Sequence, residues 1–418
     1  MRPVQKKISV TVFLLITLAA ASAKSHPKSN ETRWVATWAA SQQIPEPHNA
    51  LSPDDMRDMT MRQIVHVSIG GSTLRVHVSN AFGTEPLRFT SVHIARPLSA
   101  SSPQIDPASD RALTFSEAAD VTVPAGAEYI SDPIEYAVAP RSNLAVTFHL
   151  DSPPANETSH PGSRSTSYYM HGDLVSAPDL ADAKRIDHWY QLSTIDVRAT
   201  ASSAAIVVLG DSITDGHGTT TNGNDRWTDV LAQRLQASSA TRNLSVLNFG
   251  TGGNHLLTDG LGPNLLARFN RDVLAQAGAK YLIVFEGVND LGGLTRLGEV
   301  PPAAHADLVH RIEGAYEQIV ARAHANGIQV FGATITPFVG SEYYHPPATT
   351  EADRQTINEW IRAPGHFDAV IDFDKIIRDP QQPDRMLPIY DSSDHLHPSI
   401  AGYKAMGDAV PLTLFNAH

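Results

Sequence analysis

The chain has 418 residues, which is enough for two or three domains, and 42% of them are hydrophobic while 18% are charged. This balance is that of a folded globular protein and excludes the disordered and collagen-like classes. Lys and Arg number 32 against 44 Asp and Glu, so the formal net charge is −12. An excess of negative charge opposes binding to nucleic acid and to anionic membranes, and it favours a neutral or weakly charged substrate.

Residues 1–23 have the pattern of an export signal. A basic leader is followed by an apolar run of 13 residues over 8–20, and 21–23 offers the small-x-small site that signal peptidases cleave. A membrane anchor is the alternative, but a span needs about 20 apolar residues. We therefore expect a secreted or periplasmic protein with no stable membrane insertion after cleavage, in which a polar linker at 24–33 precedes the first domain.

Residues 34–200 have the pattern of an all-β domain. Their apolar runs are short, alternate with period two and are interrupted by Gly, Pro, Asn and Ser. The runs 64–69 and 74–78 flank Gly70-Gly71, which predicts a tight hairpin. Further strands are expected at 91–95, 121–123 and 144–150. This pattern predicts a β-sandwich-like domain, in which residues 152–167, rich in Pro, Ser, His and Asn, form a long surface loop.

In residues 201–418, strands and helices alternate. The run 206–209 is apolar throughout, as a strand buried on both faces of a parallel sheet requires. Apolar residues recur at helical spacing over 227–235, and an apolar stripe over 308–323 predicts a helix that ends at Gly327. Further strands are expected at 245–249, 281–285, 328–333 and 369–373. Five strands alternating with helices predict an α/β domain with a doubly wound parallel sheet, whose crevice lies at the carboxyl ends of the strands.

Two polar segments stand where nucleophilic catalysis needs them. Ser212, in Gly210-Asp211-Ser212-Ile213, follows the first parallel strand, so its side chain is expected to point into the crevice. A serine hydroxyl needs a base that takes its proton, and the base needs an acceptor that fixes its tautomer. His397 and Asp394 are three residues apart, before the last helix, and can supply both. Taken singly, each segment is also typical of a helix cap, with Ser399 as the cap of the last helix.

Two further segments carry donors for a developing oxyanion. Gly287-Val288-Asn289-Asp290 follows the strand 281–285, and the segment 248–254, Asn-Phe-Gly-Thr-Gly-Gly-Asn, follows the strand before it. An Asn side-chain amide and a Gly backbone N–H are suitable donors at the point where ester cleavage places negative charge. Each segment alone is more typical of a turn. Their common position at the ends of parallel strands favours a shared site, in which Asp290 has a structural role because a carboxylate cannot donate.

These four segments closely resemble the motifs of the SGNH hydrolase family, also called the GDSL esterases and lipases. The resemblance covers residues 204 to about 415, and the motifs occur in the order of the family. It implies a flavodoxin-like SGNH hydrolase fold and a serine esterase that needs no cofactor or metal. Residues 34–200, which begin with Trp34-Val35-Ala36-Thr37-Trp38, are similar, less closely, to the β-domain attached to a subset of secreted members.

The resemblance also implies a role for individual residues. Ser212 is the nucleophile, His397 is the base and Asp394 is its acceptor. The oxyanion hole is formed by the backbone N–H groups of Ser212 and Gly253 and by the Asn289 amide. The family's second motif has the form Asn-x-x-x-x-Gly, which selects Gly253 as the second glycine of its pair.

The sequence therefore predicts a secreted carboxylic ester hydrolase that works through an acyl-enzyme and removes acetyl or other short acyl groups from carbohydrate. Export and an appended β-domain suit such a polymer substrate. A lipase or arylesterase that acts on small or lipid esters is the nearest alternative. The chain lacks the Gly-x-Ser-x-Gly elbow of α/β-hydrolases, which disfavours that fold. Residues 338–350, including Tyr343, Tyr344 and His345, are expected to form a loop that shapes substrate choice.

The sequence is also compatible with two hypotheses that assign the protein to other functional classes. In the first, the β-domain binds carbohydrate and the hydrolase half is inactive, with aromatic side chains stacked on sugars: Trp34, Trp38, Tyr168 and Tyr169. Such aromatics are more often part of a core, and an intact catalytic set argues against an inactive enzyme. In the second, a metal-dependent hydrolase uses His395 and His397 together with Asp391 and Asp394, or with Asp211, Asp215 and His217.

Overall fold

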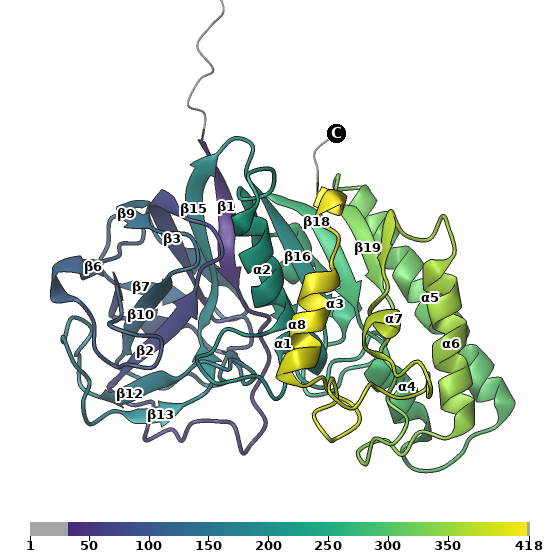
Figure 1. Ribbon diagram of the computed structural model, residues 1–418. Coiled ribbons are helices and arrows are strands. Elements are labelled where there is room, and N and C mark those ends of the chain that lie inside the picture. The colour runs from purple at the N-terminus through teal and green to yellow at the C-terminus, as the bar shows by residue number, and fades with distance from the viewer. Residues whose placement is uncertain (1–31, 416–418) are drawn as a thin grey trace, which may run out of the picture. The chain divides into compact units, whose positions relative to one another are not determined.

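The computed structural model describes residues 32–415, so the predicted signal peptide and most of the predicted linker lie outside the described residues. The described residues belong to one compact unit. Antiparallel strands make up its first part, to Thr200, and strands alternate with helices from Ala204 onward (Figure 1). Within 32–415, no helix combines the length and the hydropathy that a membrane span requires.

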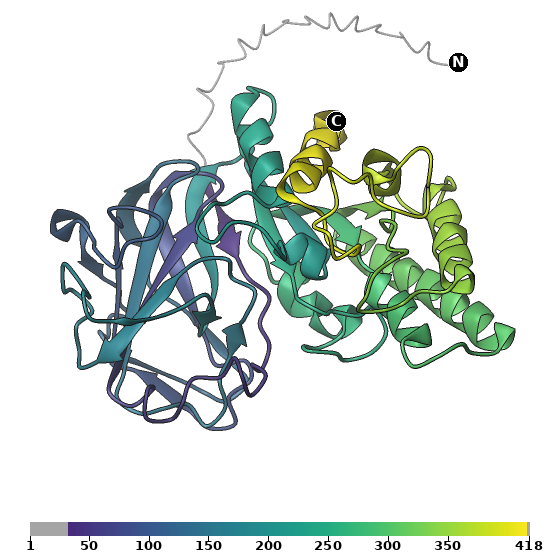
Figure 2. The same cartoon turned by 60° about the horizontal axis from the view of Figure 1, so that its bottom comes forward.

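Two antiparallel sheets form the first part (Figure 2). The five-stranded sheet has the order β1-β15-β3-β8, with β9 also paired to β3, and comprises β1 (Thr32–Ala39), β3 (Gly71–Ser79), β8 (Glu128–Ile130), β9 (Ile134–Val138) and β15 (Leu192–Thr200). The six-stranded sheet has the order β13-β12-β2-β10-β5-β6 and comprises β2 (Met59–His66), β5 (Ser91–Ala95), β6 (Arg111–Ala112), β10 (Asn143–Leu150), β12 (Ser167–His171) and β13 (Lys184–Ile186). Apolar side chains of both sheets share one core, as in a β-sandwich, which confirms the all-β prediction.

Short elements complete this part. Two strand pairs lie outside the main sheets: β4 (Leu87–Phe89) with β7 (Val121–Val123), and β11 (Ser159–His160) with β14 (Trp189–Tyr190). One 3-10 turn, η1, spans Pro107–Ser109. Asp106 caps the start of this turn by accepting the N–H of Ala108, and Pro107 occupies its first position.

The predicted hairpin at Gly70-Gly71 is wrong. The strand before it, β2, pairs with β10 and β12, whereas β3 pairs with β15, β8 and β9 in the other sheet. The chain crosses between the sheets here, and the Val67 N–H donates to the Ser142 carbonyl at 3.0 Å. A Cβ on Gly70 would lie 2.4 Å from the Val138 carbonyl oxygen. Paired glycines permit such a close crossing as well as a turn, so the local pattern did not distinguish the two.

The segment 152–167, expected as a surface loop, is buried in its second half. It contains β11, and the side chains of His160, Ser163 and Ser165 are less than a tenth exposed. Their polar atoms are satisfied inside the protein; for example, Ser165 Oγ donates to the Ile64 carbonyl at 2.7 Å. A polar composition therefore did not mean exposure, because buried polar side chains such as these have partners inside the protein.

A five-stranded parallel sheet forms the centre of the second part, as predicted. Its order is β17-β16-β18-β19-β20, with β16 (Ala204–Gly210), β17 (Leu244–Gly250), β18 (Ala279–Phe285), β19 (Gln329–Ala333) and β20 (Ala369–Ile371). All seven residues of the central strand β16 are buried, which explains its continuous apolar run. β20 is shorter than expected because Asp372 caps the next helix by accepting the Lys375 N–H.

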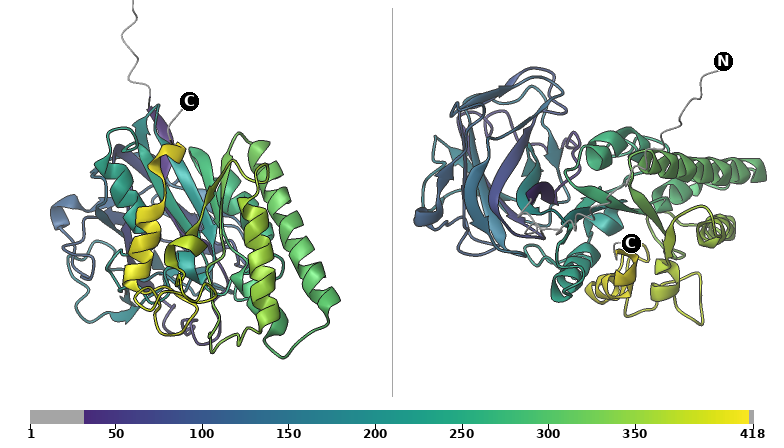
Figure 3. Two further views of the ribbon diagram at one scale, coloured as in Figure 1. Left: turned by 45° about the vertical axis from the view of Figure 1, so that its right-hand side comes forward. Right: turned by 90° about the horizontal axis from the view of Figure 1, so that it is seen from above.

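Helices cover both faces of this sheet (Figure 3). They are α1 (Ser212–Asp215), α2 (Trp227–Ala237), α3 (Leu265–Phe269), α4 (Val288–Thr295), α5 (Pro302–His324), α6 (Ala348–Arg362), α7 (Phe373–Ile377) and α8 (Ile400–Ala409), with a π-turn η2 (Asn270–Leu274) and a 3-10 turn η3 (Leu412–Phe415). α2 packs against α8, and α5 packs against α3 and α6. The stripe 308–323 lies in α5. Gly327 caps the end of this helix, as predicted: it has a φ of 70°, its N–H donates to the His324 carbonyl at 2.9 Å, and the Ile328 N–H donates to the Ala323 carbonyl at 3.0 Å.

Candidate active site

Ser212 begins the short helix α1 at the carboxyl end of the central strand. The Asp211 carboxylate caps α1 by accepting the Ile213 N–H at 2.8 Å, so this segment is both a helix cap and the site of the predicted nucleophile. α1 lies directly against the end of β17, because a Cβ on Gly250 would be 2.2 Å from the Asp215 nitrogen. A glycine at the end of β17 therefore allows Ser212 to sit close to the sheet.

Hydrogen bonds connect Ser212, His397 and Asp394 into one chain. Ser212 Oγ lies 2.8 Å from His397 Nε2, and His397 Nδ1 lies 2.6 Å from Asp394 Oδ2. Because Nδ1 donates to the carboxylate, Nε2 is the nitrogen that can accept the Ser212 proton. The fold thus brings together residues that are 185 positions apart in the sequence.

Asp394 is held in place by its own loop. Its Oδ1 accepts the backbone N–H groups of Leu396 at 2.9 Å and His397 at 2.8 Å. Burial alone would raise the pKa of Asp394, but its hydrogen bonds with His397 and Leu396 and the positive charge of His397 hold that pKa well below its ordinary value. The group therefore stays a carboxylate that can stabilise an imidazolium. Ser399 caps α8 directly after this loop, as predicted, by accepting the Gly402 N–H at 3.2 Å.

Asn289 lies in the first turn of α4, after β18, and its side-chain amide is bonded at both ends. Nδ2 donates to the Asn254 carbonyl at 2.6 Å, and Oδ1 accepts the Tyr344 hydroxyl at 2.6 Å. An amide nitrogen carries two N–H bonds, so one of them remains for another acceptor. Asn289 is 2% exposed, so this amide lies in a largely water-free position.

Gly253 adjoins Asn254 and has a φ of 64°, in the left-handed region that favours glycine. Within residues 32–415, no backbone or side-chain acceptor takes its N–H. Asn254 connects the two predicted donors, because it follows Gly253 in the chain and its carbonyl binds Asn289. This connection is not visible in the sequence, although the second motif includes Asn254.

Arg268 braces this region, and no local motif indicated it. Its side chain is 1% exposed and donates to Asn254 Oδ1 and to the Gly210 carbonyl at the end of β16. It also pairs with Asp272 at 2.9 Å, and Asp272 in turn accepts the hydroxyl of Ser41 from the β part. One guanidinium therefore fixes the end of the central strand and the second motif together.

Three carboxyl groups lie behind the predicted nucleophile: Asp211, Glu286 and Asp290. Burial, strengthened by Asp290, raises the pKa of Asp211 to about 7, and burial next to Asp211 raises the pKa of Glu286 well above its ordinary value. Burial beside like charges therefore disfavours the charged forms of Asp211 and Glu286. Asp290 has a separate task, since its carboxylate accepts the N–H groups of Leu256 at 2.8 Å and Leu257 at 3.1 Å.

The metal candidates are not gathered into one centre. Among the described residues, only His217, Asp394 and His397 have ligand atoms within 4.8 Å of one another. The His217 ring lies against that of His397, with centroids 4.0 Å apart, and both ring nitrogens of His397 are already hydrogen-bonded, to Ser212 and Asp394. No ring nitrogen of His397 is therefore left for an ion, and His395 pairs with Asp391 instead. These donors fit a triad better than a metal centre.

His217 lies directly over the predicted base. Its ring is tilted by 32° to that of His397, and its Nδ1 lies 3.3 Å from Nη2 of Arg164, a residue of the β part. His217 is exposed on one side and covered on the other, and this partial burial, with the positive charges of His397 and Arg164, lowers the pKa of His217 to about 4. A neutral ring therefore packs against the base at ordinary pH.

The β part also reaches α1 through His160. Its Nε2 lies 2.9 Å from Asp215 Oδ1, and its Nδ1 lies 2.7 Å from the Ser41 carbonyl oxygen. Both His160 and Asp215 are buried. Arg226 adds a second connection, because it donates to the carbonyls of Ser163 and Asp215. The helix that begins with Ser212 is therefore held from both parts of the chain.

The aromatic residues considered for sugar stacking do not form an exposed platform. Trp38, Tyr168 and Tyr169 are 6%, 1% and 8% exposed, so they belong to the core. Trp34 is partly exposed, but the guanidinium groups of Arg75 and Arg198 lie 4.5 Å and 5.4 Å from its ring centroid. The structure therefore contradicts sugar binding through this set.

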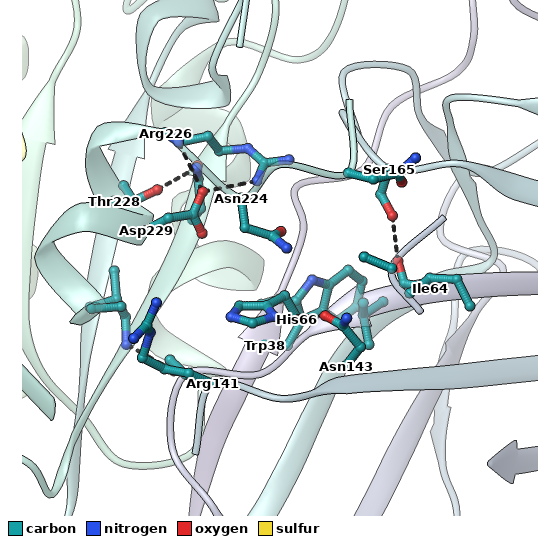
Figure 4. Close-up of a pocket in the computed structure, with 18 of the residues that line it drawn as sticks. Trp38, Ile64, His66, Arg141, Asn143, Ser165, Asn224, Arg226, Thr228 and Asp229 are labelled. Carbon is teal, nitrogen blue, oxygen red and sulfur yellow. Dashed lines mark hydrogen bonds and ion pairs between the residues drawn. The ribbon is translucent and has the colours of Figure 1, made fainter. Parts of the chain in front are cut away.

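A cavity lies between the β part and the N-terminus of α2 (Figure 4). It is lined by Trp38, His66, Asn143, Asn224 and Arg226, among others, and its volume is about 60 Å³. A volume of this size holds only a few water molecules. Because the triad residues do not line it, this cavity is not the place where an ester reaches Ser212.

A doubly wound α/β fold with a hydrogen-bonded Ser-His-Asp set at the carboxyl ends of its strands defines a serine hydrolase. Residues 208–405 match the model of the GDSL-like lipase/acylhydrolase family. This part of the chain belongs to that family, and the protein is accordingly a serine ester hydrolase. No curated protein is similar enough to match the chain.

Several solved structures are similar to about half of the chain. One is a G-D-S-L family protein from Desulfitobacterium hafniense DCB-2, with 25% identity over 50% of this chain and 97% of that chain and a TM-score of 0.37. A lipase/acylhydrolase from Enterococcus faecalis has 21% identity over 50% of this chain and 93% of its own chain, with a TM-score of 0.37. An acetyl xylan esterase from Geobacillus stearothermophilus has 19% identity over 50% of this chain and 93% of its own chain, also with a TM-score of 0.37.

Proposed function

We propose that this protein is a secreted carboxylic ester hydrolase that works through an acyl-enzyme on Ser212 and removes acetyl or other short acyl groups from carbohydrate. One observation carries the proposal: the continuous hydrogen bonds from Ser212 Oγ through His397 to Asp394, at 2.8 Å and 2.6 Å. This geometry lets a neutral imidazole take the hydroxyl proton while the carboxylate stabilises the charge that results.

The reaction proceeds in two halves. In the first, Ser212 Oγ attacks the acyl carbon while His397 Nε2 accepts the hydroxyl proton, and the ester C–O bond then breaks as His397 returns that proton to the departing alcohol. In the second, water attacks the acyl-enzyme, and His397 takes its proton and passes it to Ser212 Oγ. The products are the free acid, the alcohol and the unchanged enzyme.

The oxyanion hole is proposed to consist of the backbone N–H groups of Ser212 and Gly253 and the free N–H of Asn289. Support comes from the bonding of these groups: the Asn289 amide keeps one N–H unused, and the Gly253 N–H has no acceptor among the described residues. Donors fixed in advance stabilise the tetrahedral intermediate without reorganisation.

A carbohydrate alcohol is supported by the polar surroundings of the triad. His217 is exposed and lies against His397, and Arg164 hydrogen-bonds to it. Imidazole and guanidinium groups pair readily with hydroxyl groups. The expected export signal and the appended β part agree with a substrate found outside the cell.

An esterase that prefers longer or more apolar acyl groups is the second candidate, and Leu261 favours it. This side chain is 52% exposed, and its Cδ1 would lie only 2.9 Å from a Cβ on Gly253. An exposed apolar side chain beside a proposed oxyanion donor offers a contact for an acyl chain.

The test is the rate of acid release from acetylated xylan, acetylated pectin and nitrophenyl esters of increasing acyl length, with a Ser212→Ala variant as the blank. We expect acetate release from a polysaccharide and rates that fall as the acyl chain lengthens. A preference for long acyl chains, with no release from any polymer, would support the second candidate. No turnover of any ester by the folded wild type would contradict the proposed hydrolase.

A further inference from the structure

Tyr344 reaches Asn289 from a different element. It belongs to the connection between β19 and α6, and its hydroxyl donates to Asn289 Oδ1 at 2.6 Å. The Tyr344 side chain is buried, with only 4% of the residue exposed, and the pKa of its hydroxyl is raised by burial, so it stays a donor at all ordinary pH values.

The helix that carries Asn289 has a gap shaped for this ring. Gly292, one turn after Asn289 in α4, has no side chain, and a Cβ there would lie 2.4 Å to 2.6 Å from three atoms of the Tyr344 ring. Glycine is a poor choice inside a helix on propensity alone, since alanine is more favourable by about 1 kcal/mol. The Tyr344 ring lies across α4 in the space that a side chain at position 292 would occupy.

The opposite end of the Asn289 amide is also fixed. Nδ2 donates to the Asn254 carbonyl, which can only accept, so the nitrogen must face Asn254 and the oxygen must face Tyr344. Asn254 itself is held by Arg268 at 2.8 Å. Because both ends of the amide are hydrogen-bonded, the orientation of the remaining N–H of Asn289 is fixed.

We propose that Tyr344 is a positioning residue for catalysis: it pins the Asn289 carboxamide so that the free N–H keeps its aim at the developing oxyanion. This inference rests on the proposed function, in which Asn289 is an oxyanion donor. A hydrogen bond accepted by the amide oxygen also polarises the amide and strengthens its N–H as a donor.

The neighbouring Tyr343 provides a matched control. It is 54% exposed, the Arg296 guanidinium lies 4.0 Å from its ring centroid, and its ring meets the Tyr344 ring edge-on with centroids 4.7 Å apart, a contact that a phenylalanine would keep. Its hydroxyl has no hydrogen-bond partner among residues 32–415. Loss of the hydroxyl at 343 should therefore leave the Asn289 amide undisturbed.

The test compares Tyr344→Phe with Tyr343→Phe on one activated ester. Tyr344→Phe should lower kcat about tenfold, the effect of one lost buried hydrogen bond, and should leave KM within about twofold. Tyr343→Phe should have wild-type kcat. Gly292→Ala should repeat the loss in kcat through displacement of the ring, although alanine favours the helix. A Tyr344→Phe enzyme with wild-type kcat would overturn the proposal.

The same pair of substitutions in an Asn289→Ala background separates positioning from a general structural effect. If Tyr344 acts through Asn289, Tyr344→Phe should change kcat little once the amide is absent. An equal tenfold loss in both backgrounds would overturn the positioning role and leave the proposed function intact. A wild-type kcat in Asn289→Ala itself would instead overturn the proposed oxyanion role of Asn289, and with it the role of Tyr344.

Discussion

Asn289 and Asp290 are adjacent in α4 but have contacts of different kinds. The Asn289 amide keeps one N–H free, whereas both carboxylate oxygens of Asp290 accept backbone N–H groups, from Leu256 and Leu257. A donor with a free N–H can act in the transition state. A carboxylate that holds a loop acts in the folded state.

These contacts predict that substitution of one residue lowers turnover, whereas substitution of the other lowers stability. Asn289→Ala should lower kcat by roughly 10²–10³-fold with little change in KM, because one oxyanion donor is lost. Asp290→Ala should lower the free energy of unfolding first, by about 2 kcal/mol or more, because two N–H groups lose their acceptor. Steady-state kinetics and thermal unfolding of both variants check this. Wild-type kcat per folded molecule in Asn289→Ala would contradict the assignment.

The candidate site was predictable where its residues lie within short motifs at strand ends. Asp394 and His397 are three residues apart, and Ser212 and Asn289 each follow a recognisable strand. Arg268 and Tyr344 were not predicted to have these roles, because their partners come from distant segments. No spacing in the sequence identifies a residue whose role is to hold another side chain in position.

At the scale of elements, α1 depends on contacts from the β part. It has only four residues, so its position cannot come from its own helical hydrogen bonds. His160 binds Asp215 at its end, and a Cβ on Gly162 would lie 1.8 Å from the Asp215 carboxylate, so the segment 159–166 packs closely on α1.

Removal of this contact should affect both stability and turnover. His160→Ala leaves the buried Asp215 carboxylate without its partner, so we expect a loss of about 1–3 kcal/mol in the free energy of unfolding. We also expect kcat to fall roughly tenfold or more, because Ser212 loses its exact placement. His171→Ala is the control, since His171 is exposed and, among residues 32–415, its side chain hydrogen-bonds to the Arg57 carbonyl alone. Equal kinetics of the two variants would show that α1 is positioned without His160.

The strands were easier to predict than their partners. Residues 64–66 and the run 74–78 do lie in strands, but these strands belong to different sheets, because pairing is decided by contacts with β10 and β15 far along the chain. In the α/β part, each parallel strand is followed by a helix and the topology is restricted, so the sheet could be predicted more fully. The main error there concerns the last strand, β20, which ends at Ile371 and not at the predicted Phe373.

At the scale of the whole molecule, a buried ionic cluster connects stability to pH. His77 Nδ1 lies 2.8 Å from Glu128 and Nε2 lies 3.1 Å from Asp196, which also binds Arg75 at 2.7 Å. Burial alone would lower the pKa of His77, but its hydrogen bonds with Asp196 and Glu128 and their negative charges raise that pKa to about 9. The cluster joins β3 and β15 of the five-stranded sheet.

This cluster predicts a loss of stability at alkaline pH. The folded pKa of His77 is above the unfolded value of about 6.5, so its stabilisation is complete below pH 6.5 and is lost as pH rises through 9. The shift corresponds to about 3 kcal/mol. Urea unfolding at pH 6.5 and 9.5 should show this decrease in the wild type and a much smaller one in His77→Gln. Parallel decreases in both proteins would contradict the role of His77.

The central claim, that Ser212 is a nucleophile activated by His397, is tested most directly by peptide mass mapping after treatment with an organophosphate. We expect one covalent adduct, on the peptide that contains Ser212, formed in step with the loss of esterase activity. His397→Ala should react far more slowly, and chelators should leave the activity unchanged. An active enzyme whose Ser212 stays unmodified, or an adduct on another residue that alone accounts for the loss of activity, would contradict the account.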